Sequence, residues 1–143
     1  MKKLLKKYFR ESDFTDEQII NIFNNCKNDL EIAEESKRVE VKFIFSYNAL
    51  IKICIIILHI KKGFRIRSIP GHHIKLLEAI GLILKNDDIY DTGNAMRMKR
   101  KANMYETGLP LSKMETEDYF QFVLDLFNKT KEIVKKYKFG IDN

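Results

Sequence analysis

Apolar residues recur at intervals of three and four along most of the chain, which places them on one face of an α-helix. The pattern predicts long helices over residues 16–36, 37–62 and 113–138, and shorter helices over 72–85 and between 88 and 105. Only two prolines and six glycines interrupt the 143 residues, which favours helices over many short strands. We therefore expect an all-α domain, an antiparallel up-down helical bundle of five or six helices.

Local signals mark the ends of some of these elements. Thr15 and Gln18 are three residues apart and predict a capping box at the start of the first long helix. Gly63 is expected to end the second long helix, because glycine is common just beyond a helix C-terminus. Residues 1–10 predict a further short basic helix, and residues 64–71 (FRIRSIPG) predict a loop. Because no repeat or linker divides the sequence, we expect a single domain.

The most apolar stretch, FIFSYNALIKICIIILHI (43–60), is long enough to raise the question of a membrane span. Lys52 lies near its centre, where a charge costs about 2.5–3.5 kcal/mol in a bilayer. The flanking segments are amphipathic, as expected of helices in a globular bundle. We therefore expect the stretch to form a central bundle helix, without membrane contact.

Composition adds expectations about partners and location. The formal net charge is +6 and the isoelectric point is about 9.2, which permits anionic partners without identifying them. Cys26 and Cys54 lie in apolar surroundings, and the sequence shows neither a CxxC motif nor a secretory signal. This predicts buried free thiols, rather than a disulfide, in a cytoplasmic protein.

Four positive charges occupy six positions within MRMKRKANMY (96–105). On a helix, Arg97 and Arg100 lie close enough to contact one anion, and Lys101 lies beside Arg97. A solvated charged face is the alternative interpretation of this spacing. The helix is expected to pack against the core through Ala95, Met98, Ala102 and Tyr105, with Arg97 and Lys101 at one edge of this apolar stripe.

A second polar cluster, GHHIK (71–75), opens the predicted helix over 72–85. A helix N-terminus offers backbone N–H groups to an anion and disfavours a positively charged imidazole. Because adjacent histidines point about 100° apart on a helix, His72 and His73 rarely share one metal, and no zinc-ligand spacing is present. No metal or cofactor is therefore expected. The alternative is that one histidine packs or caps while the other is solvated. Ser46-Tyr47-Asn48, in the helix predicted over 37–62, is interpreted as a polar patch inside the bundle rather than as a nucleophile.

The order of these motifs is informative. A helix containing FSYNALIKICIIILHIKKG (45–63) precedes FRIRSIPGHH (64–73), and R-x-x-R-x-x-x-x-Y follows within MRMKRKANMYE (96–106). Over roughly residues 15–135 this order resembles the HEPN superfamily, in a branch with a YxA-type helix, a GHH helix start and an Arg-rich helix that ends in Tyr. The resemblance implies an antiparallel helical bundle, usually dimeric, of the kind found in prokaryotic toxin–antitoxin and antiviral systems.

The resemblance also implies roles for individual residues. Active members are metal-independent ribonucleases with an Arg-Asn-x-x-x-His pattern, in which Arg holds the scissile phosphate and His assists attack by the 2′-hydroxyl. Arg100 matches that Arg, whereas Lys101 stands where Asn is common and Tyr105 stands in place of His. Tyrosine, with a pKa near 10, is a poor base at neutral pH. His72 or His73 could supply the imidazole if the GHH turn reaches Arg100.

Three hypotheses follow from these residues. In the first, the chain is an RNA- or nucleotide-binding module, forms a homodimer and has a nucleotidyltransferase-type antitoxin as partner. In the second, it is a metal-independent RNA endonuclease, a toxin in which Arg100 contacts the phosphate and a GHH histidine is the acid or base. In the third, it is a structural helical dimerisation protein. The departures from the family pattern favour binding over cleavage. The residues expected to hold the phosphate are Arg97, Arg100, Lys101, Tyr105, His72 and His73.

Overall fold

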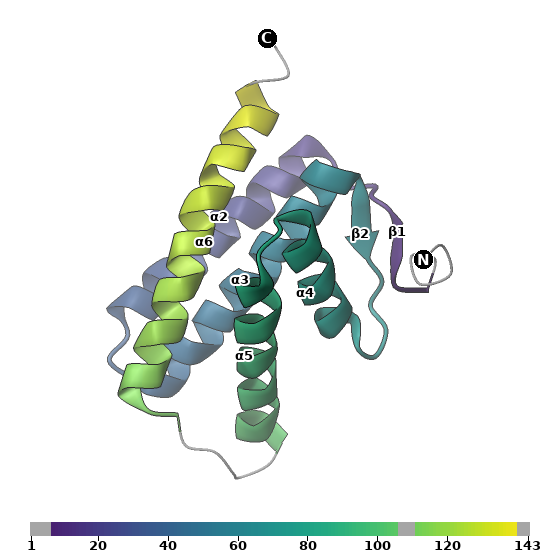
Figure 1. The fold of residues 1–143 in the computed structure, drawn as a ribbon. Coiled ribbons are helices and arrows are strands. Elements are labelled where there is room, and N and C mark those ends of the chain that lie inside the picture. Colours follow the sequence, from purple (N-terminus) through teal and green to yellow (C-terminus); the bar gives the residue numbers. More distant parts are fainter. Residues whose placement is uncertain (1–6, 106–110, 140–143) are drawn as a thin grey trace.

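The fold is helical, as the apolar pattern predicted (Figure 1). The structure is a computed structural model that describes residues 7–105 and 111–139. Helices account for 81% of it, which confirms the all-α class and the helical bundle. Its elements are β1 (Phe9–Glu11), α2 (Asp16–Glu35), α3 (Val39–Lys62), β2 (Phe64–Ile66), α4 (His72–Ile83), α5 (Asp87–Tyr105) and α6 (Lys113–Phe139).

Helix α3 is the centre of the bundle. It contacts α2, α4, α5 and α6, which explains why its sequence is apolar nearly all round. By length and composition α3 could cross a membrane, but a core helix meets the same criterion, and 61% of its most apolar window is buried inside the protein. The charge of Lys52 is met by Asp29 on α2, whose carboxylate oxygen lies 2.5 Å from the Lys52 Nζ. The helix thus has the buried, packed surroundings expected of a bundle core.

The structure confirms the predicted capping box, the predicted helix end at Gly63 and the two buried free thiols. The Gln18 backbone N–H donates to the Thr15 Oγ1 (3.1 Å), and the Thr15 N–H donates to the Gln18 Oε1 (2.9 Å), which completes the capping box of α2. Gly63 ends α3 in a left-handed conformation, with φ of 71°. Cys26 and Cys54 are both buried and free.

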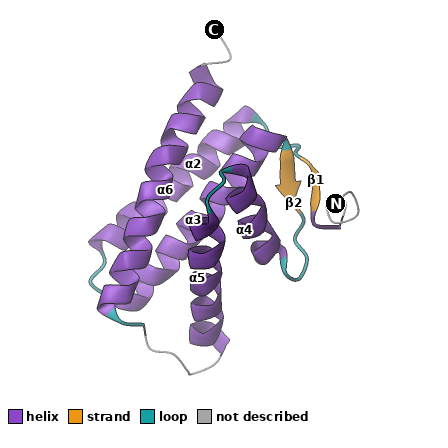
Figure 2. Cartoon of the chain, in the orientation of Figure 1, coloured by secondary structure: helices purple, strands orange, loops and turns teal. Residues whose placement is uncertain are grey.

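A small antiparallel sheet corrects two predictions (Figure 2). Strand β1 pairs with β2, with Phe9 opposite Ile66 and Glu11 opposite Phe64. The helix predicted over 1–10 is therefore wrong at residues 9–10, and the loop predicted over 64–71 is wrong at residues 64–66; residues 1–6 lie outside the described part of the chain. Local periodicity could not reveal this pairing because its two strands are far apart in the sequence. The sheet fixes the start of the chain against the segment that leads into α4.

The packing face of α5 also differs from the prediction. Met98, expected in the core, is 58% exposed, whereas Met96 is fully buried and Ala102 is buried as expected. The buried stripe runs through Gly93, where an added Cβ would come within 2.6 Å of the Leu77 Cδ2 on α4. The absence of a side chain at Gly93 therefore permits the close approach of α4 and α5. The side chain of Tyr105 lies outside the described residues.

Candidate functional site

The start of α4, the middle of α3 and the second half of α5 enclose a cavity of about 230 Å³. It brings together five of the six predicted site residues, while the side chain of the sixth, Tyr105, is not among those described. None of the lining residues that the structure describes is acidic, so the described lining carries positive charge. The lining residues are Tyr47, Gly71, His72, His73, Ile74, Arg97, Arg100 and Lys101.

A tight turn positions the two histidines. Gly71 precedes α4 with φ of 81°, a left-handed conformation that glycine adopts without steric cost. No side chain among the described residues caps this helix, so N–H groups of its first turn remain available to a ligand. The His72 Nδ1 lies 2.8 Å from the carbonyl oxygen of Ile69. Because a carbonyl only accepts, the His72 Nδ1 carries a hydrogen, and its Nε2 is the nitrogen left to exchange a proton.

The second histidine is paired with a buried tyrosine of α3. The Tyr47 hydroxyl lies 2.9 Å from the His73 Nδ1. Burial raises the pKa of Tyr47 to about 12, so this hydroxyl keeps its proton at neutral pH. Burial, and then the positive charges of His72, Arg100 and Arg97, lower the pKa of His73 to about 4. His73 is therefore neutral at pH 7, and the Tyr47 hydroxyl donates to its Nδ1.

The arginines of α5 differ in how their donors are satisfied. The Arg97 Nε donates to the Asn94 Oδ1 at 3.0 Å. The Arg100 guanidinium carbon lies 5.5 Å from the ring centroid of Tyr47. The Arg100 Nε is buried and has no hydrogen-bond partner within the described residues. A buried donor without an acceptor is unusual and costly, and an anionic oxygen in the cavity would satisfy it.

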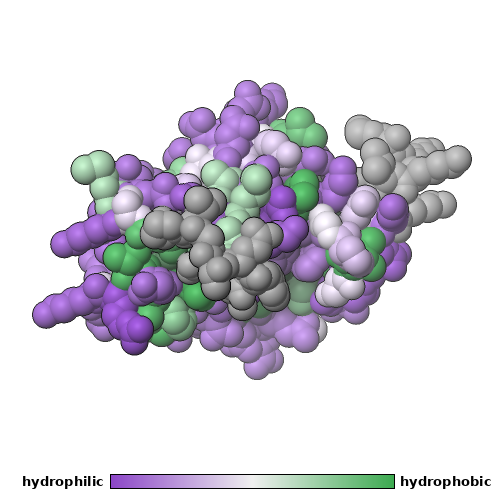
Figure 3. All heavy atoms as spheres, turned by 90° about the horizontal axis from the view of Figure 1, so that it is seen from below, coloured by the Kyte–Doolittle hydropathy of each residue, from purple (hydrophilic) through white to green (hydrophobic). Residues whose placement is uncertain are grey.

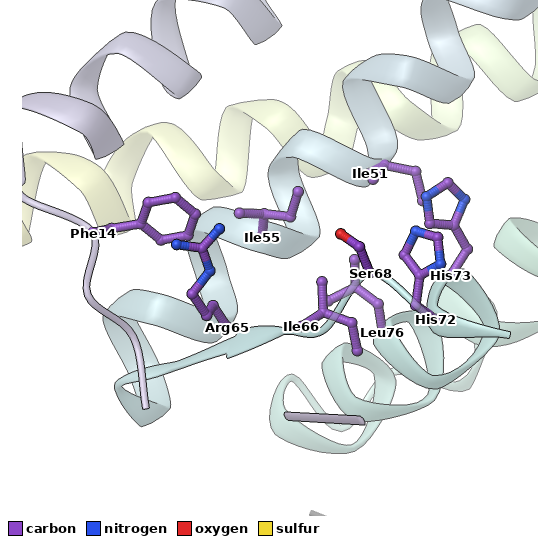
Figure 4. A pocket seen from close by; sticks show the side chains of 9 residues that line it. All are labelled: Phe14, Ile51, Ile55, Arg65, Ile66, Ser68, His72, His73 and Leu76. Atoms are coloured by element: carbon purple, nitrogen blue, oxygen red, sulfur yellow. The ribbon is translucent and has the colours of Figure 1, made fainter. Parts of the chain in front are cut away.

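An adjoining smaller cavity of about 130 Å³ shares both histidines (Figure 4). The rings of His72 and His73 lie side by side at one end, and Phe14 lies beside Arg65 at the other. The charge of Arg65 is already met, because its Nη1 lies 2.6 Å from a carboxylate oxygen of Asp13 and thereby lowers the pKa of that carboxyl. Most of the remaining lining is aliphatic: Ile51, Ile55, Ile66 and Leu76, with Ser68. The histidine pair thus separates a basic cavity from a largely apolar one.

One lining residue, Tyr47, was missed as a site residue. Its sequence context favoured a polar patch within the bundle, and it is indeed only 1% exposed. The signal that could have identified it is the YxA element of the resembled family, which contains this tyrosine. The third histidine, His59, belongs elsewhere, since its ring nitrogens face Ser12 and Tyr137. Within residues 7–105 and 111–139, no group of three or more His, Cys, Asp or Glu side chains is placed to hold a metal ion.

Comparison with known proteins leaves the site to be interpreted from its own chemistry. No protein-family model, curated protein or solved structure matches this chain. The resemblance to HEPN proteins therefore depends on the motif residues quoted above. The fold gathers residues from three of those motifs in one cavity: Tyr47 from the YxA-type helix, Gly71, His72 and His73 from the GHH turn, and Arg97 and Arg100 from the Arg-rich helix.

Proposed function

We propose that the basic cavity binds a phosphate group of RNA or of a nucleotide, in a HEPN-like binding domain. The observation that carries the proposal is the buried Arg100 Nε, which has no partner among the described residues, in a cavity whose described lining holds three Lys or Arg side chains and no carboxylate. A phosphate oxygen would supply the missing acceptor and balance the charge. The toxin–antitoxin setting, the homodimer and a nucleotidyltransferase-type partner are parts of the same proposal.

The residues that line the cavity contribute to phosphate binding in different ways. Arg97 and Arg100 present planar guanidinium groups that can each donate two parallel hydrogen bonds to a phosphate. The first turn of α4 adds backbone N–H groups and the positive end of the helix dipole. Lys101 is exposed and contributes attraction at the rim. Because His73 is neutral, the Tyr47–His73 pair contributes hydrogen bonding rather than charge.

Metal-independent RNA cleavage is the second candidate function, and the hydrogen bond from His72 to Ile69 favours it. That bond leaves the Nε2 of His72, a residue that lines the arginine cavity, as the nitrogen that can accept a proton. The 2′-oxygen of the ribose would attack phosphorus while the His72 Nε2 takes its proton, and Arg100 would stabilise the charge on the phosphorane. The bond to the 5′-oxygen then breaks, and a proton from water completes a 5′-hydroxyl beside a 2′,3′-cyclic phosphate. His73 is too weak a base for this step.

The binding proposal is tested by fluorescence anisotropy with labelled single-stranded RNA. We expect affinity to fall as salt rises, because each phosphate contact releases counterions. Arg100→Ala should weaken binding at least tenfold, a loss of about 1.4 kcal/mol or more, while the exposed Lys136→Ala variant on α6 serves as the control. Circular dichroism establishes that both variants are folded. Salt-independent binding, or equal losses in the two variants, would contradict the proposal.

Cleavage is tested with the same RNA in EDTA. A ribonuclease would yield fragments with 2′,3′-cyclic phosphate ends, and His72→Ala and Arg100→Ala would abolish them. Intact RNA that is nevertheless bound identifies a binding module. Cleavage that EDTA suppresses would argue against the His72 mechanism. Neither binding nor cleavage would leave the structural helical protein as the remaining hypothesis.

A further inference from the structure

A larger cavity, about 380 Å³, lies where α2 connects to α3 and where α6 begins. In Figure 1 these two segments lie at the same end of the bundle. Among the residues that the structure describes, the cavity shares no lining residue with the histidine–arginine cavity. Its volume falls within the range of small-ligand pockets. The lining residues are Ser36, Lys37, Arg38, Val39, Lys42, Lys113, Thr116 and Glu117.

Positive charge dominates this second cavity. Its described lining residues include four Lys or Arg side chains and one carboxylate, that of Glu117. Glu117 is paired with Lys42, with 2.7 Å between Nζ and Oε2. The other three cations, Lys37, Arg38 and Lys113, are exposed and form no ion pair with any described residue. Hydrophilic side chains also cover most of the face of the molecule seen from below (Figure 3).

Two long helices begin at this cavity. Helix α3 has 24 residues and α6 has 27, and the N-terminus of each carries partial positive charge. The first turn of α6 is capped, because the Glu115 N–H donates to the Ser112 Oγ at 3.0 Å. At the start of α3, by contrast, Arg38 occupies the N-cap position and makes no side-chain cap hydrogen bond. Its first N–H groups therefore lack the side-chain acceptor that a Ser or Asp would supply.

A buried hydroxyl provides independent support for a ligand. Thr116 lines the cavity, yet the residue is only 1% exposed. Its Oγ1 has no hydrogen-bond partner among the described residues. An unsatisfied buried hydroxyl destabilises a fold unless something else completes it. A ligand with acceptor oxygens would complete this one and would at the same time balance the surplus of cations.

We infer that this cavity binds the phosphate groups of a small phosphorylated molecule. Lys37, Arg38 and Lys113 contact the anion, and the Thr116 hydroxyl donates to one of its oxygens. Glu117 holds Lys42 at the wall of the cavity, where the Lys42 Nζ also lies 4.6 Å from the ring centroid of Phe120. The site is independent of the proposed RNA-binding cavity, since the two have no residue in common.

The inference is tested by titrating the uniformly ¹⁵N-labelled protein with sodium pyrophosphate and following backbone amide resonances. The amides of Arg38, Lys42 and Thr116 should shift in a saturable manner. Thr116→Val should weaken binding about tenfold, because one hydrogen bond to a charged group is lost. The same substitution should not lower Tm, because valine removes an unsatisfied hydroxyl. Unmoved resonances at these positions, or an unchanged affinity in Thr116→Val, would overturn the inference.

Two double variants, each of which removes two positive charges, distinguish a specific binding site from general electrostatic attraction to a basic protein. Lys37→Gln with Lys113→Gln removes two charges from the cavity, and Lys61→Gln with Lys62→Gln removes two from the exposed end of α3. The first pair should weaken pyrophosphate binding more than tenfold, and the second less than twofold. Equal losses would show attraction to net charge only. In Arg100→Ala the Thr116 shifts should persist, so failure of this site and failure of the RNA-binding proposal are distinguishable.

Discussion

Helix α3 contributes to two tyrosine–histidine pairs, and they differ in the charge beside them. Toward its start, the Tyr47 hydroxyl meets the His73 Nδ1 at 2.9 Å, beneath Arg100. Toward its end, the His59 Nε2 lies 3.3 Å from the Tyr137 hydroxyl, which in turn donates to the carboxylate of Asp16. The same pair of side chains is therefore combined with cations at one end and with an anion at the other.

In the His59–Tyr137 pair, beside the Asp16 carboxylate, the hydrogen bonds are made within the protein. Because Tyr137 gives its only proton to Asp16, the His59 Nε2 must donate to Tyr137, and the His59 Nδ1 accepts from the Ser12 hydroxyl at 2.6 Å. The Ser12 hydroxyl, both His59 ring nitrogens and the Tyr137 hydroxyl thus each have a hydrogen-bond partner, and these bonds connect the N-terminal segment with α2, α3 and α6. This arrangement is a structural connection.

The Tyr47–His73 pair, beside the arginines, lies next to a hydrogen-bond donor that the described residues leave unsatisfied. Burial lowers the pKa of both histidines, but the negative charge of Asp16 opposes the shift at His59, whereas the charges of His72, Arg100 and Arg97 deepen it at His73. In the described ranges, 7–105 and 111–139, no carboxylate lines that cavity and no acceptor meets the Arg100 Nε. The comparison shows how one motif serves structure where its charge is balanced internally, and favours binding where an external anion has to balance it.

The largest expected difference between the two pairs is the loss of stability when the tyrosine ring of each pair is removed. Tyr47→Ala should lower the free energy of unfolding by about 3–5 kcal/mol, because the ring is almost fully buried among core side chains. Tyr137→Ala should cost less, since Tyr137 is only half-buried. Urea denaturation of both variants measures the difference. An equal cost would show that the two ends of α3 are similarly packed.

A change of pH should distinguish the histidines. The pKa of His73 is lowered from 6.5 to about 4, so its contribution to stability is present above pH 6.5 and is lost as pH falls toward 4. Because His73 keeps partial solvent contact, we expect a loss of about 1–2 kcal/mol rather than the full linkage value. Urea denaturation between pH 7 and 4 should show this loss in the wild type and a smaller one in His73→Asn. Identical pH profiles would contradict the assignment.

Removal of the hydroxyl alone probes the hydrogen bonds. Tyr47→Phe should cost about 1 kcal/mol, because it leaves the His73 Nδ1 without its donor inside the cavity. Tyr137→Phe should cost less, because water can replace a partly exposed hydroxyl. Both variants can be compared in one denaturation series at pH 7. A larger effect at Tyr137 would reverse the ranking proposed here.

The smallest expected effect comes from replacing the Asp16 carboxylate by an uncharged amide. Burial and the hydrogen bond to Asp16 raise the pKa of Tyr137 to about 12. Asp16→Asn should therefore lower that pKa toward its usual value near 10, with a stability change of at most about 1 kcal/mol. Ultraviolet titration of tyrosinate absorbance, compared with Asp13→Asn as control, follows the shift. An unaltered Tyr137 titration would show that burial alone sets the pKa.

The sequence predicted what depends on neighbours along the chain. The helices predicted over 16–36, 37–62, 72–85 and 113–138 begin and end within two residues of their expected positions, and α5 fills the interval in which a fifth helix was predicted, because amphipathic periodicity and end signals are local. The pairing of β1 with β2 was missed because it joins distant segments. On α5, Met96 and Met98 are alike in sequence, and only the position of α4 decides which of them is buried.

The two cavities, too, could not be predicted from local sequence patterns. The sequence gathered the arginines and the histidines into one hypothesis only through the order of motifs, and their shared cavity is a property of the fold. Tyr47 has its hydrogen-bond partner 26 residues away, so its contribution could not be derived from spacing. The second cavity combines residues 36–42 with residues 113–117, two segments that no local pattern relates.

The close contact between Gly93 and Leu77 has a consequence for the size of the ligand that the basic cavity accepts. Position 93 sets the separation of α4, which carries the histidines, from α5, which carries the arginines. A methyl group there would collide with the end of the Leu77 side chain, which is fully buried and must then move. Where the packed core resists that movement, α4 and α5 separate and the gap between the two sets of donors widens without the loss of any donor. Gly93→Ala should therefore weaken RNA binding in the anisotropy assay even though every charge is retained. A single backbone position thus acts as a spacer that determines the width of a recognition site whose chemistry lies elsewhere.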